Sequence, residues 1–260
     1  MPRLSPLMDW QFIIPALIVL ILGSALQSAA GFAFGMFAIP LLILLGAEAY
    51  EAIAIISVCG LIQTVIGIWA LRKHIDWLQV VLMTVMAAIC IPAGVLTLGA
   101  LVESVPVSVI RQVFGSIVLC VVVVQWVWRI RPREKLHWGW MATAMPLSGF
   151  MTGLSGMGGP PAVMWVMAHN WSNRRSRATL WAFFCATTPV SWISLHQRFG
   201  DEVFTAIGNG VLMSPVMILG ILPGLWLGHR IPKPLLRQIS YVILLLVSAY
   251  AICQPLLAGS

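Results

Sequence analysis

Residues 153–161 read GLSGMGGPP and contain four glycines and two prolines in nine positions. An interior glycine costs a helix about 1 kcal/mol and an interior proline about 3 kcal/mol, so a regular helix is expected to break here. The surrounding segment, residues 138–169, is apolar enough to lie in a membrane. At the depth of the lipid hydrocarbon, irregular backbone is tolerated only where it is buried in protein or lines a water-filled cavity, because each unpaired amide or carbonyl costs several kcal/mol there. The stretch is therefore a candidate binding site.

The composition is that of a membrane protein. Hydrophobic residues make up 60% of the 260 residues and charged residues only 9%, against about 25% charged in an ordinary soluble domain. Apolar segments with short loops fill almost the whole chain, so we predict a single membrane domain over residues 1–260. The net charge of +7 comes from basic residues that cluster in those loops. That placement favours a role in membrane orientation, and we expect no nucleic-acid partner.

Eight apolar segments follow one another along the chain. They cover residues 11–46, 51–71, 77–101, 107–128, 138–169, 178–197, 203–228 and 235–257. Six of them are close to the roughly twenty residues that a spanning helix needs. The first and fifth segments are too long for one crossing and short for two, and each contains a break. The break in the first segment is GFAFGMFAIP, residues 31–40.

The two halves of the chain contain an internal repeat, over about 11–130 and 136–257. The pattern GMxxxP occurs at residues 35–40 and again at 156–161, and PxxxxRQ occurs at 106–112 and at 232–238. Each half then consists of four segments, of which the broken one comes first.

The basic residues indicate that the long segments are hairpins that return to the side they entered. If every segment crosses once and the N-terminus lies inside, eight of the 15 Lys and Arg residues lie inside and seven outside. If both long segments return, twelve lie inside and three outside, as the positive-inside rule requires. A model in which only the fifth segment returns gives thirteen against two, so the charges leave the first segment open. The twelve inside residues of the symmetric model are Arg72, Lys73, Arg129, Arg131, Arg133, Lys135, Arg174, Arg175, Arg177, Arg230, Lys233 and Arg237.

In the symmetric model each half crosses the membrane an odd number of times, so the second half is inverted relative to the first. We therefore predict an all-α polytopic membrane protein of two inverted repeats, each led by a broken helical hairpin, with about ten short or full transmembrane helices. Inverted repeats with broken helices are typical of secondary transporters, whose substrate lies where the two breaks meet and is released by alternating access.

The glycine-rich turns predict an anion site. A turn that leads into a helix N-terminus offers unpaired amides, and the helix dipole favours negative charge beside them. Close helix packing is the alternative explanation for the glycines. The candidate substrate-binding residues are Gln27, Ser28, Gly31, Phe34, Gly35 and Met36 at the first break, and Gly153, Ser155, Gly156, Met157, Gly158 and Gly159 at the second. The candidate cavity-lining residues, for which interhelical hydrogen bonds are the alternative, are Gln63, Thr64, Thr187 and Thr188.

Other chemistries have weaker support. GLSGM, residues 153–157, approaches the GxSxG pattern of a serine nucleophile but ends in methionine, and all five histidines lie in loops or at segment ends, so none is placed at membrane depth to act as base. No HExxH motif or histidine cluster indicates a metal, and the five cysteines are scattered singly. We expect no enzyme, no metal and no cofactor. A passive anion channel is the alternative to a carrier. The coupling ion, proton or sodium, and a homodimer are left open.

Several spaced motifs resemble those of the TauE/SafE sulfite exporter family. They are the two broken segments, PxG at Pro92 and Gly94 followed by PxxxxRQ at 106–112, and LPGLWLGHRIPKPLLRQ at 222–238. The resemblance covers essentially the whole chain. It implies a multi-pass carrier of the bacterial inner membrane that moves sulfite, sulfoacetate or related organosulfonates, generally outward. A carrier for a non-sulfur carboxylate is an alternative.

The first break departs from the family's usual GxGGG, because Phe32, Ala33 and Phe34 separate its glycines. Phe34 is expected to give an apolar wall suited to an organic sulfonate.

Overall fold

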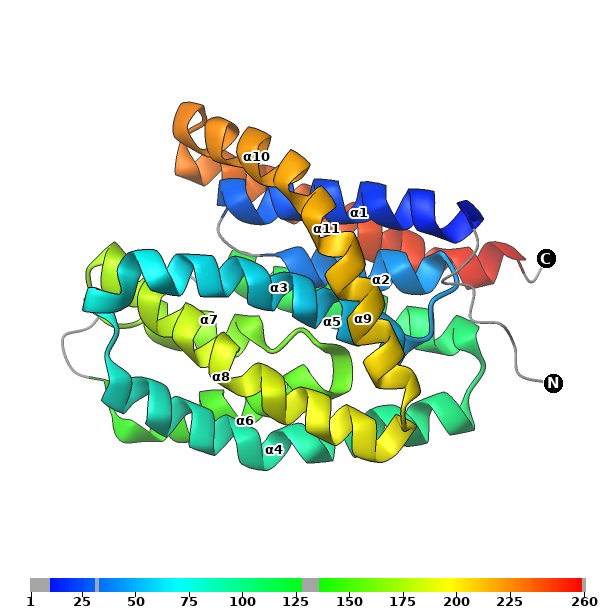
Figure 1. Cartoon of the computed structure of the whole chain (residues 1–260), viewed down its shortest axis with the longest axis horizontal. Helices are drawn as coiled ribbons and strands as arrows, with labels where there is room; N and C mark the ends of the chain where they lie inside the picture. The colour runs from blue at the N-terminus through cyan, green and yellow to red at the C-terminus, as the bar shows by residue number, and fades with distance from the viewer. Residues whose placement is uncertain (1–9, 31–32, 128–135, 259–260) are drawn as a thin grey trace. The chain divides into compact units, whose positions relative to one another are not determined.

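The computed structural model describes residues 10–30, 33–127 and 136–258 (Figure 1). Every regular element in these ranges is a helix, which confirms the predicted all-α class. The first half contains α1 (Trp10–Ala30), α2 (Phe34–Leu44), α3 (Ala49–Leu71), the 3-10 helix η2 (Arg72–His74), α4 (Trp77–Ser104) and α5 (Val107–Val127). The second half contains α6 (Trp138–Ser155), α7 (Gly159–Met167), α8 (Asn173–Phe199), α9 (Glu202–Met213), the 3-10 helix η3 (Ser214–Met217), α10 (Ile218–Arg230) and α11 (Lys233–Ala258).

Six helical stretches are long and apolar enough to cross a membrane. They are Trp10–Ala29, Ala49–Trp69, Trp77–Ser104, Val107–Val127, Asn173–Phe199 and Glu202–Gly228. The last stretch joins α9, η3 and α10 into one continuous apolar helical segment, so the described part contains ten helical segments besides the short 3-10 helix η2, in agreement with the expected number. Large apolar side chains such as Ile89 and Leu212 point away from the protein interior, as they do in helices that face lipid. The chain is a multi-pass membrane protein.

Contacts divide the chain into two compact units, each assembled from both halves of the sequence. Unit 1 contains Met1–Cys59, Ser104–Val124 and Phe204–Ser260, and unit 2 contains Gly60–Glu103 and Gln125–Val203. Unit 1 therefore holds the first broken segment, and unit 2 holds the second.

In unit 1, glycines allow α1 and α10 to approach each other closely. A Cβ atom added to Gly220 would lie 2.0 Å from the carbonyl oxygen of Ile21, and one added to Gly224 would lie 2.4 Å from that of Ala25. Residues four apart share one face of a helix, so these glycines form a single strip along α10. The hydroxyl of Ser24 donates to the carbonyl of Met217 at 3.0 Å and closes the same contact.

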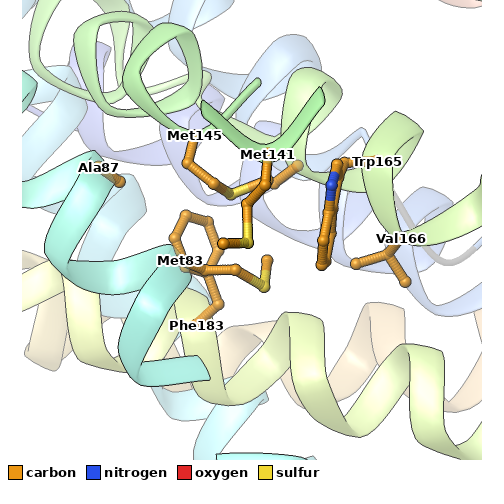
Figure 2. Close-up of a cluster of buried hydrophobic side chains, with 8 residues drawn as sticks. Met83, Ala87, Met141, Met145, Trp165, Val166 and Phe183 are labelled. Carbon is orange, nitrogen blue, oxygen red and sulfur yellow. The ribbon is translucent and has the colours of Figure 1, made fainter. Parts of the chain in front are cut away.

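In unit 2, α4 and α6 make the corresponding close contact. A Cβ atom on Gly94 would lie 2.2 Å from the carbonyl oxygen of Phe150, and one on Gly149 would lie 2.0 Å from that of Ala87. Beside this contact, side chains from α4, α6, α7 and α8 form an apolar cluster (Figure 2). The buried members of the cluster are Met83, Ala87, Met141, Met145, Ala162, Trp165, Val166 and Phe183.

The first broken segment folds back on itself within unit 1. The ring of Phe34, at the start of α2, lies so close to α1 that a Cβ atom on Gly23 would be 2.9 Å from it. Figure 1 shows α2 running back alongside α1, and the two helices pack against each other. The first segment is therefore a helical hairpin, as the symmetric arrangement of the charges predicts.

The second broken segment also returns, within unit 2. The hydroxyl oxygen of Ser148 lies 2.5 Å from the carbonyl oxygen of Gly158, ten residues later, whereas a continuous helix would separate such residues by about 15 Å. Beyond α7, Arg175 forms an ion pair with Asp76, which immediately precedes α4. A single crossing would place these two residues on opposite sides of the membrane. The predicted hairpin is therefore confirmed.

Candidate functional site

The irregular backbone of the second break is shorter than predicted. α6 continues to Ser155 and α7 begins at Gly159, so only Gly156–Gly158 is non-helical, in place of the predicted residues 153–161. Pro160 and Pro161 form the first turn of α7, where proline is tolerated because the N–H groups of a first turn have no partner within the helix.

Gly156 ends α6. Its backbone adopts the left-handed region at φ 68°, which favours glycine, and its amide donates to the carbonyl of Thr152 at 2.9 Å. The chain then reverses through Met157 and Gly158 into α7.

Two hydroxyl groups of α6 hold the turn in place. Ser148 is fully buried, and its hydroxyl donates to the carbonyl of Gly158. The hydroxyl of Thr152 donates to the carbonyl of Ser148 at 2.8 Å. A Cβ atom on Gly158 would lie 1.8 Å from the hydroxyl oxygen of Thr152, so only glycine fits at this position. Neither Ser148 nor Thr152 was predicted as a site residue from the sequence, although two hydroxyl residues four apart on the helix before a break are a visible signal.

The turn offers three consecutive backbone donors. The amides of Met157, Gly158 and Gly159 donate to no acceptor among the described residues. Met157 and Gly158 are buried, and an unpaired buried donor costs about 1–3 kcal/mol. The next two residues are prolines without an N–H group, so the donors at the N-terminus of α7 are concentrated in this turn. The positive end of the α7 dipole adds to them, and the arrangement suits an oxyanion.

The other two predicted residues of the second break lie within α6. Gly153 faces α4, where an added Cβ atom would lie 2.1 Å from the carbonyl oxygen of Ile91, so close packing accounts for this glycine. Ser155 is fully buried, and its hydroxyl donates to the carbonyl of Met151 at 3.0 Å. The turn itself thus brings together Gly156, Met157, Gly158 and Gly159.

The first break contains strained backbone. Ala33, which precedes α2, adopts φ 90° and is the one non-glycine residue with positive φ among the described residues. Such a conformation costs of order 1–3 kcal/mol and is found preferentially at functional sites. The predicted site residue Gly31 lies outside the described residues.

The remaining predicted residues of the first break lie on both sides of Ala33. Gln27 and Ser28 are partly buried in the last turns of α1, and Gly35 is partly buried in α2. Phe34 and Met36 are buried, and the ring of Phe34 packs over Gly23, so it serves the contact between α1 and α2. Pro40 lies inside α2 rather than in irregular backbone.

The four candidate cavity residues differ in their hydrogen bonds. The hydroxyls of Thr64, Thr187 and Thr188 each donate to a carbonyl one turn earlier in the same helix. Gln63 in α3 is different, because both polar atoms of its side-chain amide are buried without a partner in the described part of the chain. Of the four, Gln63 has unused hydrogen-bonding capacity.

These features define a class of protein, a multi-pass helical membrane protein with broken helical hairpins inside its compact units. A family model described as "Sulfite exporter TauE/SafE" matches residues 16–251, nearly the whole chain, and the chain belongs to this family. The resemblance noted in the sequence is thereby confirmed. Searches of curated proteins and of solved structures found no match. Family membership assigns the chain to membrane transporters of the sulfite-export type.

Proposed function

We propose that this protein is a secondary carrier of the bacterial inner membrane that exports a small sulfur oxyanion, such as sulfite or an organosulfonate like sulfoacetate. The observation that carries the proposal is the α6–α7 turn, where three consecutive amides have no acceptor within the described residues. Family membership supports the class of substrate. The role of the protein is transport rather than catalysis.

The turn would bind the anion through neutral donors. Each amide donates to one oxygen of the sulfite or sulfonate group, and the dipole of α7 stabilises the charge. No lysine or arginine lies between residues 136 and 173, so the turn offers the anion no cation from its own segment. Hydrogen bonds to a charged acceptor contribute about 1.5–3 kcal/mol each, which is enough for recognition without trapping the substrate.

Release to the other side requires a conformational change that exposes the site alternately. The internal repeat predicts that the first break acts on the same anion, and this stays a prediction. The coupling ion is not assigned.

The test is sulfite efflux from proteoliposomes that contain the full chain, scored against the amount of folded protein. Gly158→Ala should lower efflux at least about tenfold, because the new methyl group overlaps the hydroxyl of Thr152 and displaces the donors. Gly60→Ala is the matched control, since a Cβ atom on Gly60 meets nothing within 4 Å. Equal efflux by the two variants would remove the turn from the mechanism.

Two alternatives predict different results in the same vesicles. A carrier for non-sulfur carboxylates would move acetate or malonate faster than sulfite or sulfoacetate. A passive channel would give flux that does not saturate with anion concentration and would show unitary currents, whereas a carrier saturates.

A further inference from the structure

Basic residues gather at one end of unit 2, where α3 ends and α8 begins. η2 packs against α8, and the ion pair between Asp76 and Arg175 joins the two loops. Asp76 is the only acidic residue in these two loops, residues 72–76 and 168–177, so their five basic residues and one acidic residue give a net charge of +4. The five residues, called the basic end from here on, are Arg72, Lys73, Arg174, Arg175 and Arg177.

The opposite end of unit 2 is acidic. Glu103, at the end of α4, pairs with Arg198, near the end of α8, at 2.6 Å. Asp201 and Glu202 follow directly, so three acidic residues and one basic residue give a net charge of −2. Charge is therefore separated along the length of α4 and α8. By the positive-inside rule, the basic end faces the cytoplasm.

Indole rings hold several of the guanidinium groups in place. The Cζ atom of Arg72 lies 5.7 Å from the centre of the Trp69 ring, and that of Arg177 lies 4.8 Å from the Trp181 ring. Trp69 is 73% exposed, and Trp77 at the start of α4 is 60% exposed. Exposed tryptophans at helix ends mark the level of the lipid headgroups.

Four of the five basic residues carry no acidic partner among the described residues, because Asp76, the one acidic residue of these two loops, pairs with Arg175. Stacking on an indole face uses the π surface of a guanidinium and leaves its N–H donors on the edge free. Paired N–H donors match the oxygens of a phosphate group. The basic end therefore presents free phosphate-binding donors at headgroup depth.

We propose that the basic end binds the headgroup phosphate of an anionic phospholipid, such as phosphatidylglycerol, in the cytoplasmic leaflet. A lipid fits better than a free phosphate ion because the exposed ring of Trp69 lies against Arg72 and suits the glycerol and upper acyl region. The exposed Trp77, which follows Asp76 in the chain, adds a second interfacial ring. The bound lipid clamps the α3–α4 loop to the start of α8.

The test is a lipid titration of the full purified chain in neutral detergent, followed by native mass spectrometry. Phosphatidylglycerol should bind at least about fivefold more tightly than phosphatidylcholine. Arg174→Gln combined with Arg177→Gln should lower that preference about fivefold or more. These substitutions remove positive charge from a helix N-terminus, where it is unfavourable, so the variant should fold. Arg198→Gln is the matched control on the other end of α8 and should keep the preference.

Inorganic phosphate and glycerol phosphate are added as competitors at the lipid concentration. Failure to displace the lipid supports the proposal, and displacement by either compound at equal concentration would overturn the choice of a lipid. If the α8 variant cannot be purified, Arg72→Gln combined with Lys73→Gln removes charge from the exposed η2 turn instead. An unchanged preference in the variant that is measured would refute the proposal.

Discussion

Ser148 is the residue that fixes the shape of the candidate site. Its buried hydroxyl donates to the carbonyl of Gly158 and so holds the turn against α6, although it is not itself one of the free donors. A residue of this kind positions the backbone that binds, and its loss should affect binding more than helix formation.

We expect Ser148→Ala to weaken anion binding by about fivefold to a hundredfold. The substitution leaves the buried carbonyl of Gly158 without its donor, which costs about 1–3 kcal/mol and loosens the turn. The measurement is the concentration of sulfite that gives half-maximal efflux from proteoliposomes. Ser155→Ala is the control, because the hydroxyl of Ser155 only donates within its own helix. A larger effect at Ser155 than at Ser148 would show that Ser155 contacts the anion, as the sequence alone suggested.

Gln63 permits a prediction about stability. Both polar atoms of its amide are buried without a partner among the described residues, and such groups cost about 1–3 kcal/mol. Gln63→Leu has a similar volume and removes the unpaired groups, so we expect a higher unfolding temperature in detergent. A lower unfolding temperature would mean that the amide is hydrogen-bonded to water or to a ligand in the native protein. Thr64→Val, at a residue with a satisfied hydroxyl, is the comparison.

At the scale of elements, the sequence predicted both hairpins but not their limits. Helix propensities treat every glycine and proline of residues 153–161 as unfavourable for a helix, so the whole stretch was predicted to be irregular. The structure has irregular backbone only at Gly156–Gly158. Proline is harmless in a first turn, and Gly153 is helical because α4 packs against it. The local sequence around a glycine does not show which distant helix will pack against it. The hydrogen bond from Ser148 to Gly158 could not be predicted either, because it depends on how the chain folds back.

The α4–α6 contact gives a test at this scale. Gly153→Ala would bring a methyl carbon to about 2.1 Å from the carbonyl oxygen of Ile91, so the two helices must separate. Overpacking of this kind costs about 1–3 kcal/mol, and we expect a lower unfolding temperature in detergent. The half-maximal sulfite concentration of the folded fraction should stay unchanged, because Gly153 lies outside the turn. A variant with normal stability but weakened sulfite binding would instead place Gly153 in the site.

At the scale of the whole molecule, the distribution of basic residues and the folded structure indicate the same placement of the loops. The repeat and the positive-inside rule predicted returning segments from sequence, and the pair between Asp76 and Arg175 places the α3–α4 and α7–α8 loops at one end of unit 2. The division into two units was not predicted, because it depends on which helices pack, and α6 packs on α4 from the other half of the chain.

Cysteine accessibility tests this orientation. In a variant without the five native cysteines, Lys73→Cys and Arg174→Cys should react with a membrane-impermeant maleimide only after the cytoplasmic side is opened. Asp201→Cys, at the acidic end of unit 2, should react in intact cells. Labelling of positions 73 and 174 from opposite sides would contradict the returning fifth segment. If positions 73 and 174 react from outside and position 201 only from the cytoplasmic side, the hairpin is supported and the proposed orientation is wrong. The experiment therefore tests the hairpin, for which the Asp76–Arg175 ion pair is evidence, separately from the orientation in the membrane, for which the distribution of basic residues is evidence.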